Sequence, residues 1–291
     1  MDFAQQLVNG VQIGSVYALV AIGYTMVYGI AKMINFAHGD IIMVGSYVAL
    51  LFFQSSGLPV WGVIAATAAV SAVLGVTIER LAYKPLRGGS RMSALITTIG
   101  VSLMLQNGFL LIFGSSPKPF PNHFTGEGFT LGGVTVSRLT AITLVVTVVL
   151  MVLLTLFVNR TRVGKAMRAV SEDQGAAQLM GINIDTSISI TFAIGSALAA
   201  VAAVLYSSTY PLINPYMGSM LGLRAFIAAV IGGIGVIPGA MIGGSIIGIA
   251  EALIKRYISS AMADAIVFAL LIIVLLVKPS GLLGRNEREK V

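Results

Sequence analysis

The segment from residue 35 to 40 places an amide, an imidazole and a carboxylate close together in an apolar part of the chain, on Asn35, His38 and Asp40. Such side chains could bind a metal ion or a polar solute, and ionisable groups at membrane depth are costly enough to be functional candidates by default. A metal site would need more ligands than the sequence offers nearby. Two interpretations remain: the three side chains line a solute pathway, or they lie at a membrane interface, where Asp40 favours the start of the next helix.

A second polar segment interrupts the apolar sequence and has the same residue pattern. Ile213-Asn-Pro-Tyr-Met-Gly218 and Ile34-Asn-Phe-Ala-His-Gly39 both read Ile-Asn-x-x-x-Gly. With the orientation given below, the two breaks are expected on opposite membrane faces, as an inverted repeat with discontinuous helices would place them. Three matched letters can also arise by chance in a Gly-rich chain. If the repeat is real, the pathway lies between the halves, and backbone groups at the breaks could meet a zwitterionic solute. The candidate pathway residues are Asn35, His38, Asp40 and Asn214.

Residues 168–181 form a polar, helix-compatible island of about four turns, with apolar sequence resuming near Ile188. Ala176, Ala177 and Gly181 offer small side chains for close approach by another surface, while Glu172 and Asp173 would strengthen a helix start. These features predict a docking helix for a soluble partner. The alternative is an amphipathic interfacial helix with no partner.

Three further features are assigned no site. The Gly-rich run 232–244 lacks the Gly-Lys-[Ser/Thr] ending of a phosphate loop and favours close helix packing instead. Arg224 is expected to extend to the outer membrane edge. Glu251 and Lys255 have the i,i+4 spacing of an ordinary helix pair. The chain therefore has no nucleotide-binding motif of its own.

The amino-acid composition indicates which class of structural element positions these residues. The chain has 57% hydrophobic and 10% charged residues, whereas soluble domains carry roughly 25% charged residues. This composition predicts an all-α, polytopic transmembrane bundle, in one domain over residues 1–291. The absence of cysteine excludes disulfides and thiolate metal sites.

Apolar stretches long enough to cross a bilayer predict eight or nine spans, depending on whether 221–257 forms two spans or a re-entrant element. The first is expected to be retained, because no Lys or Arg precedes it. The expected spans are 7–30, 38–53, 60–82, 93–113, 138–158, 186–206, 221–236, 238–257 and 262–277.

The basic residues predict the orientation, because cytoplasmic loops are enriched in Lys and Arg. Most of the 18 basic residues fall on one side if the N-terminus is outside and the C-terminus cytoplasmic. This bias accounts for the net charge of +7, which does not indicate a nucleic-acid partner. The inside segments are then 31–37, 83–92, 159–185 and 278–291.

Together, several motifs resemble the permease subunits of bacterial branched-chain amino acid ABC importers over nearly the full chain. The resemblance implies a translocation subunit in the bacterial inner membrane, paired with a second, homologous permease. It also implies two cytoplasmic ATP-binding subunits, an extracytoplasmic solute-binding protein, and leucine, isoleucine or valine as solute. The motifs are 14–19, 23–29, 33–40, 168–182, 222–226, 232–235 and 238–240.

The resemblance also identifies the polar island as similar to the cytoplasmic coupling helix of ABC importers, whose pattern is Glu-Ala-Ala-x-x-x-Gly. Here Gly175 stands where the pattern has glutamate, and the nearest acid is Glu172, one turn earlier. The implied docking residues are Glu172, Gly175, Ala176, Ala177 and Gly181, within a coupling loop at about 159–185.

We expect a permease without bond chemistry of its own, without cofactor or metal, driven by ATP hydrolysis on partner subunits. One alternative is a permease of the same family for urea, short amides or another small solute. Another is an ion-coupled secondary transporter or channel, which would need intramembrane acids. Asp40, Glu251 and Asp264 are the acids that come near, all at plausible interfaces. No nucleophile–base pair supports a membrane enzyme.

Overall fold

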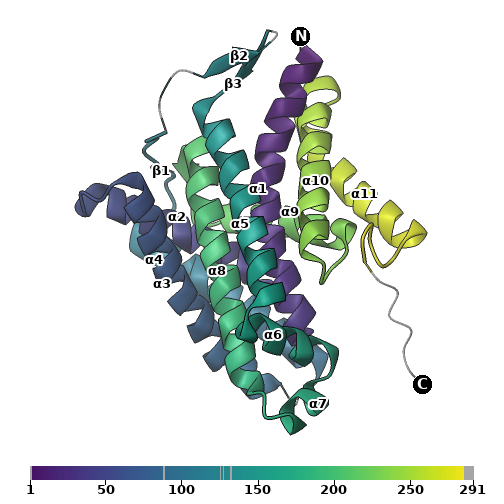
Figure 1. The fold of residues 1–291 in the computed structure, drawn as a ribbon. Coiled ribbons are helices and arrows are strands. Elements are labelled where there is room, and N and C mark those ends of the chain that lie inside the picture. The colour runs from purple at the N-terminus through teal and green to yellow at the C-terminus, as the bar shows by residue number, and fades with distance from the viewer. Residues whose placement is uncertain (1, 88, 125, 127, 132, 285–291) are drawn as a thin grey trace.

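The computed structural model describes residues 2–87, 89–124, 126, 128–131 and 133–284. Arg285, Arg288 and Lys290, which contribute to the predicted inside segment 278–291, lie outside the described residues. The described chain forms a helical bundle with two small pairs of strands (Figure 1). Its α-helices are α1 Asp2–Ala31, α2 His38–Ser55, α3 Val60–Ile78, α4 Arg91–Phe113, α5 Arg138–Arg160, α6 Arg162–Glu172, α7 Gln174–Leu179, α8 Ile184–Thr209, α9 Met217–Gly232, α10 Ile237–Tyr257 and α11 Ala263–Val277.

Short elements connect the helices. A π-helical turn η1 (Glu79–Tyr83) and a 3₁₀ turn η2 (Lys84–Leu86) follow α3, and a 3₁₀ turn η3 (Ser260–Met262) precedes α11. Strands β2 (Phe129–Leu131) and β3 (Val134–Val136) form a hairpin, while β1 (Lys118–Pro119) pairs antiparallel with β4 (Leu212–Ile213). The loop between α4 and α5 therefore contributes three short strands.

The centre of the bundle is α1, which is mostly buried and packs against α8, α9 and α10. Small residues allow these backbones to touch, as close packing in lipid requires. A Cβ on Gly14 would lie 2.8 Å from the carbonyl oxygen of Gly244, and one on Gly232 would lie 2.0 Å from that of Gly239. The packing interpretation of the Gly-rich run is confirmed.

Seven described helices are long and apolar enough to cross a membrane. They are α1, α3 with η1 and η2, α4, α5, α8, α10 and α11 with η3. The multi-pass helical membrane fold is thus confirmed. Helices α2 and α9 fall outside this set, α9 because it is shorter. The count of eight or nine spans and the sides of the termini stay predictions. Figure 1 places α7 and the N-terminus at opposite ends of the molecule.

Candidate functional site

The α1–α2 break turns the chain back into the bundle. Lys32, just after α1, adopts a left-handed backbone with φ 54°. Helix α2 then begins beside the last third of α1: a Cβ on Gly23 would lie 2.6 Å from His38 Nε2. The rings of Tyr24 and His38 meet edge to face at 4.6 Å. Because Gly23 precedes Ala31 by two turns, α2 starts about 12 Å inside the end of α1.

The α8–α9 break returns to the same point. A Cβ built on Gly39 would lie 2.4 Å from the carbonyl oxygen of Gly218, and the converse distance is also 2.4 Å. The glycines that end the two Ile-Asn-x-x-x-Gly segments therefore meet inside the bundle, because each break re-enters the bundle before its helix resumes. The prediction that the breaks open on opposite membrane faces stays a prediction. The N-terminal ends of the discontinuous helices α2 and α9 thus converge. We call this contact, between Gly39 and Gly218, the helix junction.

Asp40 links this junction to α4. Its Oδ1 accepts a hydrogen bond of 2.9 Å from Gln106 Nε2, which also lies 2.9 Å from the Oγ of Ser219 on α9. Asp40 is 1% exposed and lies in the first turn of α2. The helix-cap residue is Ala37, which makes no side-chain hydrogen bond. Asp40 thus lies where an acid favours a helix start, as expected, but its carboxylate bonds another helix rather than capping α2.

The other pathway candidates differ in their surroundings. Asn35 and His38 are each 1% exposed. Both amide atoms of Asn35 and Nε2 of His38 lack a hydrogen-bond partner among the described residues. Leaving a buried polar group unpaired costs about 1–3 kcal/mol, so these atoms are not placed for stability. Asn214 is half-buried, and its Oδ1 accepts from Tyr216 N at 2.9 Å, which shapes the turn into α9.

The polar island forms two helices rather than one. Asp173 separates α6 from α7 with φ −153°, and its Oδ1 accepts a hydrogen bond of 2.9 Å from Ala176 N. Asp173 therefore caps α7, as an acid before a helix does, whereas Glu172 is the last residue of α6. Glu172 is exposed.

The remaining island residues lie around α7. Gly175, Ala176 and Gly181 are exposed, but Ala177 is 4% exposed and packs into the protein. Gly181 has φ 80° and ends the helix, as glycine commonly does. Sequence analysis missed the two most exposed apolar side chains here, Leu179 at 91% and Met180 at 81%.

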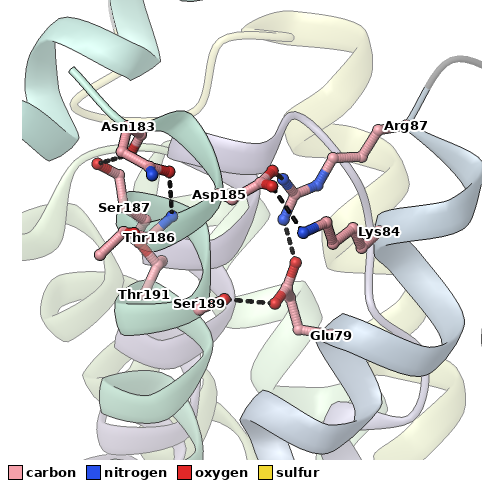
Figure 2. A network of polar contacts seen from close by, with 9 residues as sticks. All are labelled: Glu79, Lys84, Arg87, Asn183, Asp185, Thr186, Ser187, Ser189 and Thr191. Atoms are coloured by element: carbon pink, nitrogen blue, oxygen red, sulfur yellow. Dashed lines mark hydrogen bonds and ion pairs between the residues drawn. The ribbon is translucent and has the colours of Figure 1, made fainter. Parts of the chain in front are cut away.

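A polar network ties the start of α8 to the α3–α4 connection (Figure 2). Arg87 forms ion pairs with both Glu79 and Asp185. Glu79 is buried and accepts a hydrogen bond of 2.6 Å from Ser189 Oγ. Lys84 Nζ lies 2.7 Å from Asp185 Oδ2. Sequence analysis counted the basic residues here only as orientation signals. The sequence signal that could have indicated this network is Glu79, an acid near the end of the apolar span 60–82.

A second ion network joins α1, α9, α10 and α11, with Glu251 buried and Asp264 part-exposed. Arg224 Nη1 lies 2.9 Å from Glu251 Oε1, and Arg224 Nε donates to Asp264 Oδ1 at 3.0 Å. Tyr17 OH donates to Glu251 Oε2 at 2.6 Å. Arg224 thus pairs inside the protein rather than extending to the membrane edge. Glu251 is 1% exposed, and its expected place at a membrane interface stays a prediction. The Glu251–Lys255 pair is confirmed, as one part of this network.

The sequence matches known transport proteins along nearly its whole length. The model of the family described as branched-chain amino acid transport system, permease component, matches residues 6–275. The high-affinity branched-chain amino acid transport system permease protein LivH of Escherichia coli is 49% identical, over 99% of this chain and 98% of the relative. The corresponding protein BraD of Pseudomonas aeruginosa is 48% identical over the same shares. The ribose import permease protein RbsC of Escherichia coli is 26% identical, over 83% of this chain and 75% of its own.

One solved structure resembles the bundle. PsaBC from Streptococcus pneumoniae, in complex with Fab, aligns with a TM-score of 0.50 at 15% identity, covering 96% of this chain and 93% of that chain. At this identity the likeness concerns the fold alone.

Proposed function

We propose that this chain, which belongs to the family of permease components of branched-chain amino acid transport systems, forms the translocation subunit of an ATP-driven importer of leucine, isoleucine or valine in a bacterial inner membrane. The observation that carries the proposal is 49% identity to LivH across 99% of the chain. Residues 1–291 act as one permease domain, and ATP is hydrolysed on separate subunits. The proposed partners are a second homologous permease, two cytoplasmic ATP-binding subunits and an extracytoplasmic solute-binding protein.

Reconstitution tests this function directly. Vesicles carrying the permease with its ATPases, second permease and binding protein should accumulate labelled leucine only when ATP is enclosed. Uptake that persists without ATP and without ATPase subunits would indicate an ion-coupled transporter or channel instead. If urea or a short amide were accumulated and leucine were not, the solute assignment would fail while the importer assignment stood.

The α7 end is the proposed docking site for an ATPase. Its support is the pair of exposed apolar side chains on Leu179 and Met180, beside exposed Gly175, Ala176 and Gly181. Apolar side chains that project from a polar loop commonly mark an interaction site. The resemblance to a coupling helix gives the same site. In this arrangement Ala177 supports α7 from within, and Glu172 lies at the edge of the surface.

Replacing both Leu179 and Met180 with serine should weaken ATPase-subunit binding by about tenfold or more, because an interface that fully buries a Leu or Met side chain gains about 1.5–3 kcal/mol from each. Co-purification at graded ATPase concentration measures the effect. The matched control is Gln178→Ser, at an exposed position in the same loop, which should bind as the parent does. Unchanged binding of the double variant would remove α7 as the docking element.

The helix junction is the proposed neighbourhood of the solute pathway. Asp40 makes no ion pair with any described residue, and the N-terminal ends of α2 and α9 meet beside it. An unpaired acid within a membrane bundle is a functional candidate, and discontinuous helices form solute sites in transporters. Asn35 and His38 belong to the same proposal through their unpaired polar atoms, and Asn214 through its position before α9.

Asp40→Asn keeps the shape and the acceptor for Gln106 but removes the charge. Leucine uptake should fall by about tenfold, the loss expected when one charge-assisted contact of roughly 1.5 kcal/mol is removed, with assembly unchanged. The control is Ser46→Ala on the same helix, which removes a buried hydrogen bond of 2.9 Å to Ser207. Full uptake by Asp40→Asn would exclude a role for the charge in the pathway.

A further inference from the structure

The connection between α7 and α8 is short and is hydrogen-bonded to both helices. Only residues 180–183 separate the two helices. Ile182 N donates to Ala177 O at 3.0 Å, which fixes the turn onto α7. Asn183 Oδ1 accepts from Thr186 N at 3.0 Å, which fixes the turn onto α8. A displacement of α7 must therefore reach the first turn of α8.

The first turns of α8 are held in turn by the α3–α4 connection. Asp185 and Ser189 have i,i+4 spacing and lie on one face of α8. Arg87 binds Asp185 and Glu79 at once, and Glu79 also accepts from Ser189 (Figure 2). Farther along, a Cβ on Gly75 of α3 would lie 2.0 Å from Ser196 Oγ of α8. Helices α3 and α8 are thus joined both by packing and by charge.

Beyond the network, the chain leads to the helix junction. Helix α4 begins only a few residues after Arg87 and carries Gln106, which bonds Asp40 and lies against Ser219. Little of α4 is buried within the protein, so little packing within this protomer opposes its movement. Glu79 stands in a single π-helical turn, a distortion that is often found at functional sites.

We propose that Arg87 is a positioning residue that ties the α7–α8 connection to the α3–α4 connection, so that a displacement of α7 by a cytoplasmic ATPase moves α3 and α4 against the helix junction. The inference rests on the proposed function, because it assigns the route by which ATP hydrolysis reaches the pathway. Arg87 suits this role because its guanidinium can bind two carboxylates at once, one buried on η1 and one half-exposed on α8.

Arg87→Met should uncouple transport. Leucine uptake in reconstituted vesicles is expected to fall by about tenfold or more, while ATPase-subunit binding and basal ATP hydrolysis stay within about twofold, because coupling between sites typically amounts to 5–150-fold. Arg87→Lys should recover part of the uptake by keeping one ion pair. The control is Lys84→Met, which removes a pair between two half-exposed side chains. Such surface pairs contribute little, so uptake should be unchanged.

A second variant removes the effect of burying an unpaired charge. Arg87→Met combined with Glu79→Gln leaves no uncompensated carboxylate at the buried position but still lacks the tie to Asp185. Uptake should stay low in this double variant although its thermal stability returns toward that of the parent. If Glu79→Gln restored uptake together with stability, Arg87 would be structural and the proposal would be overturned.

The distance between the two connections can be measured directly, because the chain contains no cysteine. Spin labels on Leu81→Cys and Thr186→Cys, both at exposed positions, report that distance by double electron–electron resonance. The distance distribution should be the same in nucleotide-free and ATP-trapped complexes, and Arg87→Met should shift or broaden it in the ATP-trapped state. A parent distance that changes with nucleotide, or an unchanged Arg87→Met distribution, would refute the tie. Absence of ATP-dependent uptake in the parent would instead refute the proposed function.

Discussion

Gly39→Ala is expected to lower the stability of the folded permease by about 3 kcal/mol or more, because the added methyl group meets backbone rather than a side chain that can move. Its Cβ would lie 2.4 Å from the carbonyl oxygen of Gly218 and 3.0 Å from the Cα of Gly222. Helices α2 and α9 would have to separate at the junction. The midpoint of thermal unfolding in detergent should drop by about 6 °C or more.

Two sets of variants bracket this result. Gly100→Ala and Gly108→Ala place the same methyl group on α4, where nothing lies within 4 Å, and should leave the midpoint unchanged or slightly raised. Gly218→Ala should match Gly39→Ala. The two changes together should cost less than their sum, because both force the same separation. A Gly39→Ala protein as stable as the α4 variants would contradict the close crossing.

Glu251→Ala should destabilise the protein by about 3 kcal/mol, because it removes a buried carboxylate and leaves three donors without their acceptor. The carboxylate accepts from Tyr17, Arg224 and Lys255. Arg224 would still pair with Asp264 but would lose Glu251, the more buried of its two acidic partners. Thermal unfolding in detergent measures the effect, and Glu251→Gln should fall between alanine and the parent because it keeps acceptor capacity.

A control variant and a double variant are compared by the same measurement, the midpoint of thermal unfolding. Glu172→Ala removes an exposed carboxylate and should change the midpoint little. Arg224→Met with Glu251→Met replaces both charges of this pair by apolar groups and should be less harmful than Glu251→Ala alone, since apolar replacement of a buried ion pair is often neutral. If the double variant were the less stable of the two, the network would contribute more than mutual neutralisation.

Sequence reasoning predicted the features that depend on local composition. The helical membrane bundle followed from the scarcity of charge, and the packing of residues 232–244 followed from their small side chains. The break beginning at Asn35 and its counterpart at Asn214 were both found from the Ile-Asn-x-x-x-Gly pattern. Sequence patterns suffice to predict a structural feature when neighbouring residues in the chain determine it.

The features that were missed depend on contacts between distant segments. The contact of Gly39 with Gly218 needed the direction in which the chain leaves each break, which the left-handed Lys32 sets on one side. Arg224 bonds residues 27 and 40 positions away. No periodicity in a sequence relates such separations. The division of the polar island at Asp173 was also missed, because an acid within a polar run fits a helix as well as a cap.

The junction of α2 and α9 also imposes an order on biosynthesis. Gly39 leaves the ribosome about 180 residues before Gly218, and chains are made from the N-terminus at roughly 5–20 residues per second. During that interval the first turn of α2 is not yet covered by α9, and Gln106, the hydrogen-bond donor to Asp40, still lacks its second partner Ser219. The nascent N-terminal half therefore carries an unfinished polar surface within the membrane. Insertion of α9 completes both halves in a single late step.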